Sequence, residues 1–277
     1  MSGKLYLTAT PIGNLGDISQ RCADTLAGVD FIAAEDTRNS LKLLNHLGIK
    51  KELVSYFEHN KAQRGGYIIE RLLAGESCAL ITDAGMPAIS DPGEDIVRLC
   101  HENGVEVTVI PGPCAAVSAL ALSGLATSRF AFEGFLPSVS AQRKAALEKL
   151  KYEDRTIIFY EAPHRLKKTL SDMYEVFGNR DIAICKEITK LHEKTVKTTL
   201  ERASEMYGEN EKGEFVLIVS GYTEDKNEYT EDDLAKLLDE YVLNGMSVSA
   251  AVKKVSALTG VSKNAVYRIA NAQNRTE

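Results

Sequence analysis

The most distinctive part of the sequence is Cys78-Ala79-Leu80-Ile81-Thr82-Asp83-Ala84-Gly85-Met86-Pro87-Ala88-Ile89-Ser90-Asp91-Pro92-Gly93. It opens with an apolar run of the length of a buried strand. The twelve residues from Thr82 to Gly93 then hold two prolines, two glycines and two aspartates, which is the composition of a rigid loop. Helical spacing follows. A strand, a stiff loop and a helix in succession are typical of an α/β fold.

The same succession recurs along most of the chain. A glycine stands between a helical stretch and the next strand at Gly28, Gly48, Gly75, Gly104 and Gly178, where the left-handed conformation ends a helix. We therefore predict a mostly parallel α/β fold. The predicted strands are 5–8, 31–34, 53–57, 78–82, 105–110, 130–135, 156–160, 182–185 and 215–220.

Two changes in composition divide the chain. The first change falls near residues 123–140, where a small-residue helix gives way to a strand and then to a turn-rich stretch at 136–140. We place the boundary at the start of this region, between residues 122 and 123. The acidic stretch 222–230 lacks periodicity, as a linker would. Beyond it, helices are predicted at 231–243, 247–258 and 262–272. The expected organisation is an N-terminal α/β domain (1–122), a second α/β domain (123–222) and a helical tail (230–277).

The composition is that of a folded globular protein. The chain has 277 residues, 44% hydrophobic and 26% charged, which excludes a disordered protein. Its apolar stretches fall short of the ~20 residues that span a membrane. The net charge of −6 argues against a general nucleic-acid binder. The first residues carry no secretory signal, so we expect a cytoplasmic protein.

Several common sites are missing. The histidines and cysteines lack the H-x-x-x-H and C-x-x-C spacings of metal sites, so no metal is expected. The phosphate loop, the dinucleotide G-x-G-x-x-G and the G-x-S-x-G elbow are absent. Four stiff loops stand at strand ends instead, at 10–17, 34–38, 82–93 and 109–116. They predict a ligand cleft. Two plainer interpretations stay open: 10–17 is a simple connection, and 34–38 is a helix N-cap with its ion pair.

The four stiff loops, in this order, resemble the tetrapyrrole methylase superfamily, and five strings of the sequence resemble its branch of ribosomal RNA methyltransferases. The resemblance implies two α/β domains with S-adenosylmethionine (SAM) in the cleft between them, and a homodimer. It implies transfer of a methyl group from SAM to the ribose 2′-hydroxyl of a cytidine in the decoding region of 16S rRNA. The strings are TPIGNLGDI (10–18), AEDTR (34–38), TDAGMP (82–87), FEGFLP (132–137) and FYEAPHR (159–165).

The same resemblance implies which positions hold the cofactor. Residues of the loop 10–17 lie beside the cofactor, and residues of the loop 82–93 bind it. Two small residues at the start of the next helix also contact it, and three residues of the second half cover the adenosine. These residues are Pro11, Gly13, Asp83, Ala84, Gly85, Met86, Ala88, Ile89, Cys114, Ala115, Tyr160, Glu161 and Ala162.

Methyl transfer to an alcohol needs alignment and a proton acceptor. A carboxylate, or a lysine with a lowered pKa, could accept the proton, and an arginine could hold a phosphate. Structural ion pairs are the alternative for each of these side chains. The candidates at strand ends are Glu35, Asp36, Arg38, Lys186, Glu187, Lys190 and Glu193.

The tail resembles a helix-turn-helix, with Ser256, Gly260 and Val266 at the small, turn and apolar positions and Ser262 as an N-cap. Three-helix packing alone would give the same pattern. The overall charge hides opposed regions: 205–240 carries −9, whereas 139–170 and 251–277 each carry +4. Salt-sensitive docking to shaped RNA is therefore predicted. The proposed RNA contacts are Arg143, Lys144, Arg165, Lys263 and Arg268.

Two other functions stay open at this point. A methyltransferase for small tetrapyrrole-type molecules would keep the cofactor loops without needing the tail. A non-catalytic nucleic-acid-binding module would use the tail and leave the four stiff loops unexplained.

Overall fold

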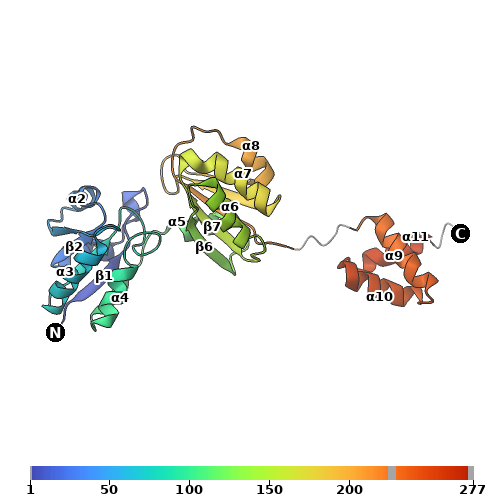
Figure 1. Cartoon of the computed structure of the whole chain (residues 1–277), viewed down its shortest axis with the longest axis horizontal. Helices are drawn as coiled ribbons and strands as arrows, with labels where there is room; N and C mark the ends of the chain where they lie inside the picture. The colour runs from blue at the N-terminus through green and yellow to red at the C-terminus, as the bar shows by residue number, and fades with distance from the viewer. Residues whose placement is uncertain (1, 224–228, 274–277) are drawn as a thin grey trace. The chain divides into compact units, whose positions relative to one another are not determined.

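The computed structural model describes residues 2–223 and 229–273, without the side chains of residues 272 and 273. These residues form two compact units, one ending at Tyr222 and one beginning at Thr223. The first unit contains two five-stranded sheets, and the second is a bundle of three helices (Figure 1). Within the described residues, no helix is long and apolar enough to cross a membrane.

The first sheet is parallel throughout. Its strands follow the order β3-β2-β4-β1-β5, so that β4 and β1 lie centrally and their loops leave from one edge. Side chains of β2 and β4 are buried on both faces, which explains their continuous apolar sequences. The strands are β1 (Lys4–Thr8), β2 (Phe31–Ala34), β3 (Glu52–Ser55), β4 (Cys78–Ile81) and β5 (Glu106–Ile110).

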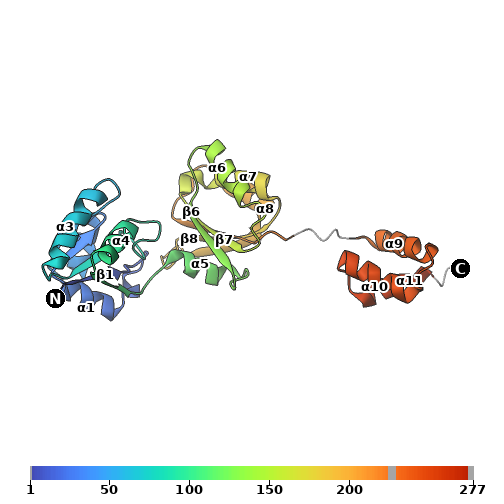
Figure 2. The same ribbon diagram turned by 60° about the horizontal axis from the view of Figure 1, so that its bottom comes forward.

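Helices cover both faces of this sheet (Figure 2). Leu26 of α1 (Gln20–Gly28) and Leu44 of α2 (Thr37–His46) belong to one core. Ile68 of α3 (Lys61–Leu73) and Ile96 of α4 (Glu94–Glu102) belong to the other. The prediction of a parallel α/β domain is confirmed for this half.

The second sheet is mixed, so the predicted parallel pairing holds for the first sheet and only in part for the second. Its order is β6-β7-β10-β8-β9, and β6–β7 is its only parallel pair of neighbouring strands among the described residues. β9 is absent from the predicted strands because its sequence, KTVKTT, is polar. It forms an edge of the sheet, where exposed lysines are common. The strands are β6 (Phe130–Phe135), β7 (Thr156–Glu161), β8 (Asp181–Lys186), β9 (Lys194–Thr199) and β10 (Phe215–Val219).

Four helices pack on this second sheet. One face is covered by α6 (Ser140–Lys149), α7 (Leu166–Phe177) and α8 (Leu200–Met206), and the other by α5 (Ala115–Ser123) (Figure 2). The predicted boundary between residues 122 and 123 would cut α5. Because α5 packs on the second sheet, the change from one half to the next lies at its N-terminal side.

The predicted helix-ending glycines are confirmed at four joints, where Gly48, Gly75, Gly104 and Gly178 have positive φ. The prediction is wrong for Gly28, which is the last residue of α1 and lacks a positive φ. Two short 3₁₀ turns, Leu15–Asp17 and Pro163–Arg165, complete the first unit.

The second unit contains α9 (Glu231–Leu243), α10 (Val248–Thr259) and α11 (Lys263–Gln273). Thr230 and Asp233 form a capping box that begins α9. Gly260 has a φ of 69°, and the hydroxyl of Ser256 donates to the carbonyl of Val261 at 2.7 Å. Val266 is fully buried in the shared core, so the turn has the features predicted for a helix-turn-helix.

Candidate active site

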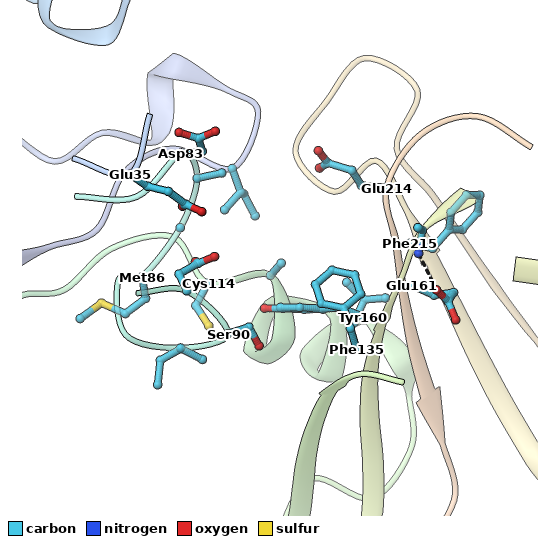
Figure 3. A pocket seen from close by; sticks show the side chains of 18 of the residues that line it. Glu35, Asp83, Met86, Ser90, Cys114, Phe135, Tyr160, Glu161, Glu214 and Phe215 are labelled. Carbon is cyan, nitrogen blue, oxygen red and sulfur yellow. Dashed lines mark hydrogen bonds between the residues drawn. The ribbon is translucent and has the colours of Figure 1, made fainter. Parts of the chain in front are cut away.

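Loops from both sheets surround one pocket of about 430 Å³, a volume typical of small-molecule sites (Figure 3). The first sheet contributes Ile12, Glu35 and the loop after β4. The start of α5 contributes Cys114 and Ala115, and the second sheet contributes the ends of β6 and β7 and the start of β10. The remaining lining residues are Asp83, Ala84, Gly85, Met86, Ile89, Ser90, Asp91, Phe135, Tyr160, Glu161, Ala162, Pro163, Glu214, Phe215 and Val216.

The loop after β4 is held in an uncommon backbone conformation. Thr10 and Gly85 exchange N–H···O bonds of 2.9 and 3.0 Å, which tie this loop to the one after β1. Ala88 and Ser90 have φ values of 67° and 65°, in the left-handed region that non-glycine residues rarely adopt. Such residues cost ~1–3 kcal/mol each and cluster at ligand sites. At Gly93 a Cβ would lie 2.7 Å from the Cβ of Ala88, so the turn requires glycine.

Three carboxylates lie on the wall formed by the first sheet: Glu35, Asp83 and Asp91. Burial, together with the neighbouring charges of Glu35 and Asp83, raises the pKa of Asp91 to about 6. Burial and the charge of Asp83 also raise the pKa of Glu35. The side-chain amide of Asn39 donates to Asp83 at 2.9 Å and orients it.

Asp91 was not among the predicted site residues. Asp91 belongs to the same stiff loop as Asp83. The presence of a second aspartate in that loop is the feature of the sequence that could have identified it as a site residue. Within the described residues, these carboxylates do not form a group suited to a metal ion.

Aromatic rings form the opposite wall. The hydroxyl of Tyr160 accepts the Ala116 N–H at 3.2 Å, which fixes the ring against the start of α5. Burial raises the pKa of this phenol to about 12, so it stays protonated near neutrality. Phe132 and Phe135 both contact the Tyr160 ring, with centroids 5.0 and 5.5 Å away. In Figure 3 the hydroxyl end of Tyr160 points toward the wall that carries Ser90.

Glu161 lines the pocket, but its carboxylate serves the fold. It accepts the Ala162 N–H at 2.7 Å (Figure 3). It also pairs with Arg165 at 2.6 Å and accepts the hydroxyl of Thr169 at 2.5 Å. The side chain is 1% exposed. The predicted contact of Glu161 with the cofactor is therefore left to its backbone. Its carboxylate acts indirectly, by holding the turn after β7.

Most of the positions implied for the cofactor line this one pocket, and three do not. Ile12 lines it, whereas its predicted neighbours Pro11 and Gly13 do not, and neither does Ala88. A Cβ on Gly13 would lie 2.5 Å from the Lys190 side chain, so this glycine admits the lysine stem. These assignments remain predictions about SAM contacts.

Of the seven predicted catalytic residues, Glu35 alone lines the pocket. Asp36 caps α2 and forms a two-bond ion pair with Arg38, with N···O distances of 3.1 and 2.7 Å. The hydrogen bonds from Arg38 lower the pKa of Asp36 to about 2. The open alternative of an N-cap with its ion pair is thus the observed arrangement of Asp36 and Arg38.

The other four candidates lie at the connection between β8 and β9. Lys186 pairs with Glu211 at 3.7 Å, and the Thr189 N–H donates to Glu193 at 2.5 Å. The ammonium of Lys190 lies 3.0 Å from Glu187 and 2.9 Å from Glu214.

Burial works against the charge of Lys190, but these two carboxylates raise the pKa of its ammonium above the usual value. For Lys190, this contradicts the hypothesis of a lysine base with a lowered pKa.

The predicted RNA contacts differ in accessibility. Arg143 is 3% exposed and pairs with Asp172 at 2.6 Å, so its burial contradicts a role in RNA contact. Arg165 is committed to Glu161 and to the carbonyl of Leu136. Lys144 is partly exposed and pairs with Glu175. Lys263 and Arg268 are exposed on α11. The partner of Arg143 is distant in the sequence and has no local signal, whereas the partner of Arg165, Glu161, lies four residues before it.

Comparison with known proteins decides the family. Residues 4–204 match the family model described as Tetrapyrrole (Corrin/Porphyrin) Methylases. The chain belongs to the tetrapyrrole methylase family. Tetrapyrrole methylases use SAM, so the chain is a SAM-dependent methyltransferase.

Two relatives are similar over nearly the whole length. "Ribosomal RNA small subunit methyltransferase I" of Halalkalibacterium halodurans is 48% identical, covering 96% of this chain and 94% of that one. The protein of the same name from Haemophilus influenzae is 46% identical, covering 97% and 96%. The crystal structure of uroporphyrin-III-C-methyltransferase from Thermus thermophilus shares the fold, with a TM-score of 0.57, 19% identity and coverage of 79% of this chain and 94% of that one.

The pocket of this tetrapyrrole methylase fits SAM. Cys114 and Ala115 are small, so a flat ring can approach the start of α5, with Tyr160 as the facing aromatic surface. Glu35, Asp83 and Asp91 would offer carboxylates to the positively charged sulfonium and ammonium groups of SAM. The backbone of the loop after β4 supplies further hydrogen-bonding groups.

Proposed function

We propose that this enzyme transfers a methyl group from SAM to the ribose 2′-hydroxyl of a cytidine in the decoding region of 16S rRNA. The observation that carries the proposal is the 48% identity, over 96% of the chain, to a protein named as a small-subunit rRNA methyltransferase. That match extends beyond residue 204, where the match to the general methylase model ends. The likeness to the tetrapyrrole enzyme covers 79% of the chain.

Bound SAM supplies an electrophilic methyl group. The residues of the pocket have to hold that methyl group in line with the attacking ribose oxygen, and good alignment contributes ~7–11 kcal/mol. The loop after β4 is suited to this task because its backbone is fixed by the Thr10–Gly85 bonds. Tyr160, anchored on Ala116, closes the other side.

Glu35 is the proposed proton acceptor for the 2′-hydroxyl. It lines the pocket, it has no cation among the residues that shift its pKa, and its raised pKa makes it a better base than an ordinary glutamate. Asp36, next to it, is already paired with Arg38. A positioned base contributes typically ~10²–10⁴-fold to such a step.

The helical unit is proposed to contact RNA through α11, where Lys263 and Arg268 are exposed. Its core is complete without the first unit, so it can act as a separate binding element. A homodimer is part of the same proposal, because the family resemblance implies it.

Three acceptors offered with labelled SAM test the function: undermethylated 30S subunits, free rRNA and tetrapyrrole precursors. We expect label in the rRNA of subunits. Label confined to the precursors would instead support a small-molecule methyltransferase. No label in any acceptor, together with no SAM binding by calorimetry, would contradict both enzyme functions.

A further inference from the structure

β6 carries a bulge directly before Phe135. Side chains alternate along a strand, so residues 132 and 135 would point to opposite faces of a regular one. The register of β6 against β7 shifts between Phe132 and Gly134, after which Phe135 pairs with Tyr160. Both phenylalanine rings consequently contact Tyr160. The extra residue turns Phe135 to the face where the pocket lies.

The bulge depends on glycine. Gly134 has a φ of 62°, and a Cβ there would lie 3.1 Å from the hydroxyl oxygen of Ser90. Ser90 belongs to the opposite wall and itself has a positive φ. The bulge therefore brings the end of β6 against the loop after β4, with Phe135 lining the pocket beside that contact.

Phe135 is nevertheless open to solvent. It is 57% exposed, although it lines the pocket and touches Tyr160. β6 is also an edge strand, with no neighbour on its outer side in the described sheet. Tyr160, in contrast, is partly buried and fixed by Ala116. The two rings thus form an inner and an outer aromatic surface.

We propose that Phe135 is the platform on which the base of the acceptor nucleotide stacks while its ribose enters the pocket. This inference rests on the proposed function. Enzymes that act on nucleotides within folded RNA need the target unstacked, and aromatic side chains replace the lost stacking. The inner ring of Tyr160 then faces the methyl donor, and the outer ring of Phe135 faces the acceptor. A ring face contacts any base, so Phe135 positions the nucleotide without selecting cytosine.

The test compares F135A and F135Y with F130A. Phe130 is a matched control because it lies on the same strand, is 41% exposed and does not line the pocket. Methylation of undermethylated 30S subunits gives kcat/KM, and calorimetry gives the Kd for SAM. We expect F135A to lower kcat/KM for subunits by about 5- to 150-fold, the range for loss of one stacked base. F135Y should restore most of the activity, and F130A should match the wild type, with the Kd for SAM unchanged in all three.

Three results would overturn the inference while leaving the proposed function intact. They are an unchanged kcat/KM in F135A, an equal loss in F130A, or a loss in F135A that is matched by weaker SAM binding. The last result would place Phe135 in the cofactor site. A wild-type enzyme that transfers no methyl group to subunits would instead contradict the proposed function itself, and the inference with it.

Discussion

At the level of single residues, some side chains at the site line the pocket, whereas their sequence neighbours stabilise the fold. Glu35 and Asp36 are adjacent in the sequence, yet Glu35 lines the pocket and Asp36 caps α2. The sequence identified both as candidates because a carboxylate at a strand end suits either role. Asp36 is directed by the local turn that begins α2, where Arg38 binds it, whereas the surroundings of Glu35 include Asp83 from a distant segment.

Replacing Glu35 with glutamine tests the proposed base. The substitution keeps the size of the side chain and removes its ability to take a proton, so kcat should fall by about 10²- to 10⁴-fold. The Kd for SAM from calorimetry should change much less. D36N is the control, since its carboxylate is paired outside the pocket, and it should retain most of the activity. Equal losses in the two variants would contradict the assignment.

The raised pKa of Asp91 leads us to expect an unusual dependence of stability on pH. Its pKa is raised to about 6 in the folded chain from an ordinary 3.8, so the folded state binds this proton more tightly than the unfolded state. Stability from this group is present below pH 4 and is lost as the pH rises through 6. D91N should therefore melt at a higher temperature than the wild type at pH 7.5 and at a similar temperature at pH 4.

Asp95 provides a control of opposite sign. Its hydrogen bond from Lys61 lowers its pKa, so it contributes stability above pH 4 that is lost on acidification. D95N should melt at a lower temperature than the wild type at pH 7.5. A D91N variant that behaves like D95N would contradict the account of Asp91.

At the scale of elements, the sequence predicts the strands of the first sheet because their apolar runs and stiff loops are local signals. β9 is not predicted because a polar edge strand has no apolar run to indicate it. The bulge in β6 also escapes, since FAFEGF looks like a regular strand until its register against β7 is known. The mixed order of the second sheet depends on pairings between distant segments, which no local pattern encodes.

The contact between α6 and α7 gives a stability prediction. Arg143 is buried against Asp172 and also donates to the carbonyls of Pro137 and Ser138. R143Q leaves Asp172 without its buried partner and should lower the free energy of unfolding by about 3–5 kcal/mol. K144Q, one residue along α6 and partly exposed, should cost less than about 1 kcal/mol. Chemical denaturation measures both, and equal effects would show that Arg143 is not a structural residue.

At the scale of the whole molecule, the two compact units suggest a division between chemistry and substrate docking. A chain ending at Gly221 keeps both sheets and every residue of the pocket. We expect it to bind SAM with unchanged affinity, whereas kcat/KM for 30S subunits should fall about tenfold or more through loss of the basic α11. Unchanged methylation by this shortened chain would contradict the RNA-binding role of the helical unit.

Methylation of a ribose in 16S rRNA is tested by the chemical position of the new methyl group. Undermethylated 30S subunits treated with the enzyme and SAM are digested to nucleosides, which are separated and identified by mass spectrometry. We expect one new product, 2′-O-methylcytidine, that is missing when E35Q replaces the wild type. A methyl group on the base, or rRNA without any new methyl group, would show that this enzyme does not methylate a ribose of 16S rRNA.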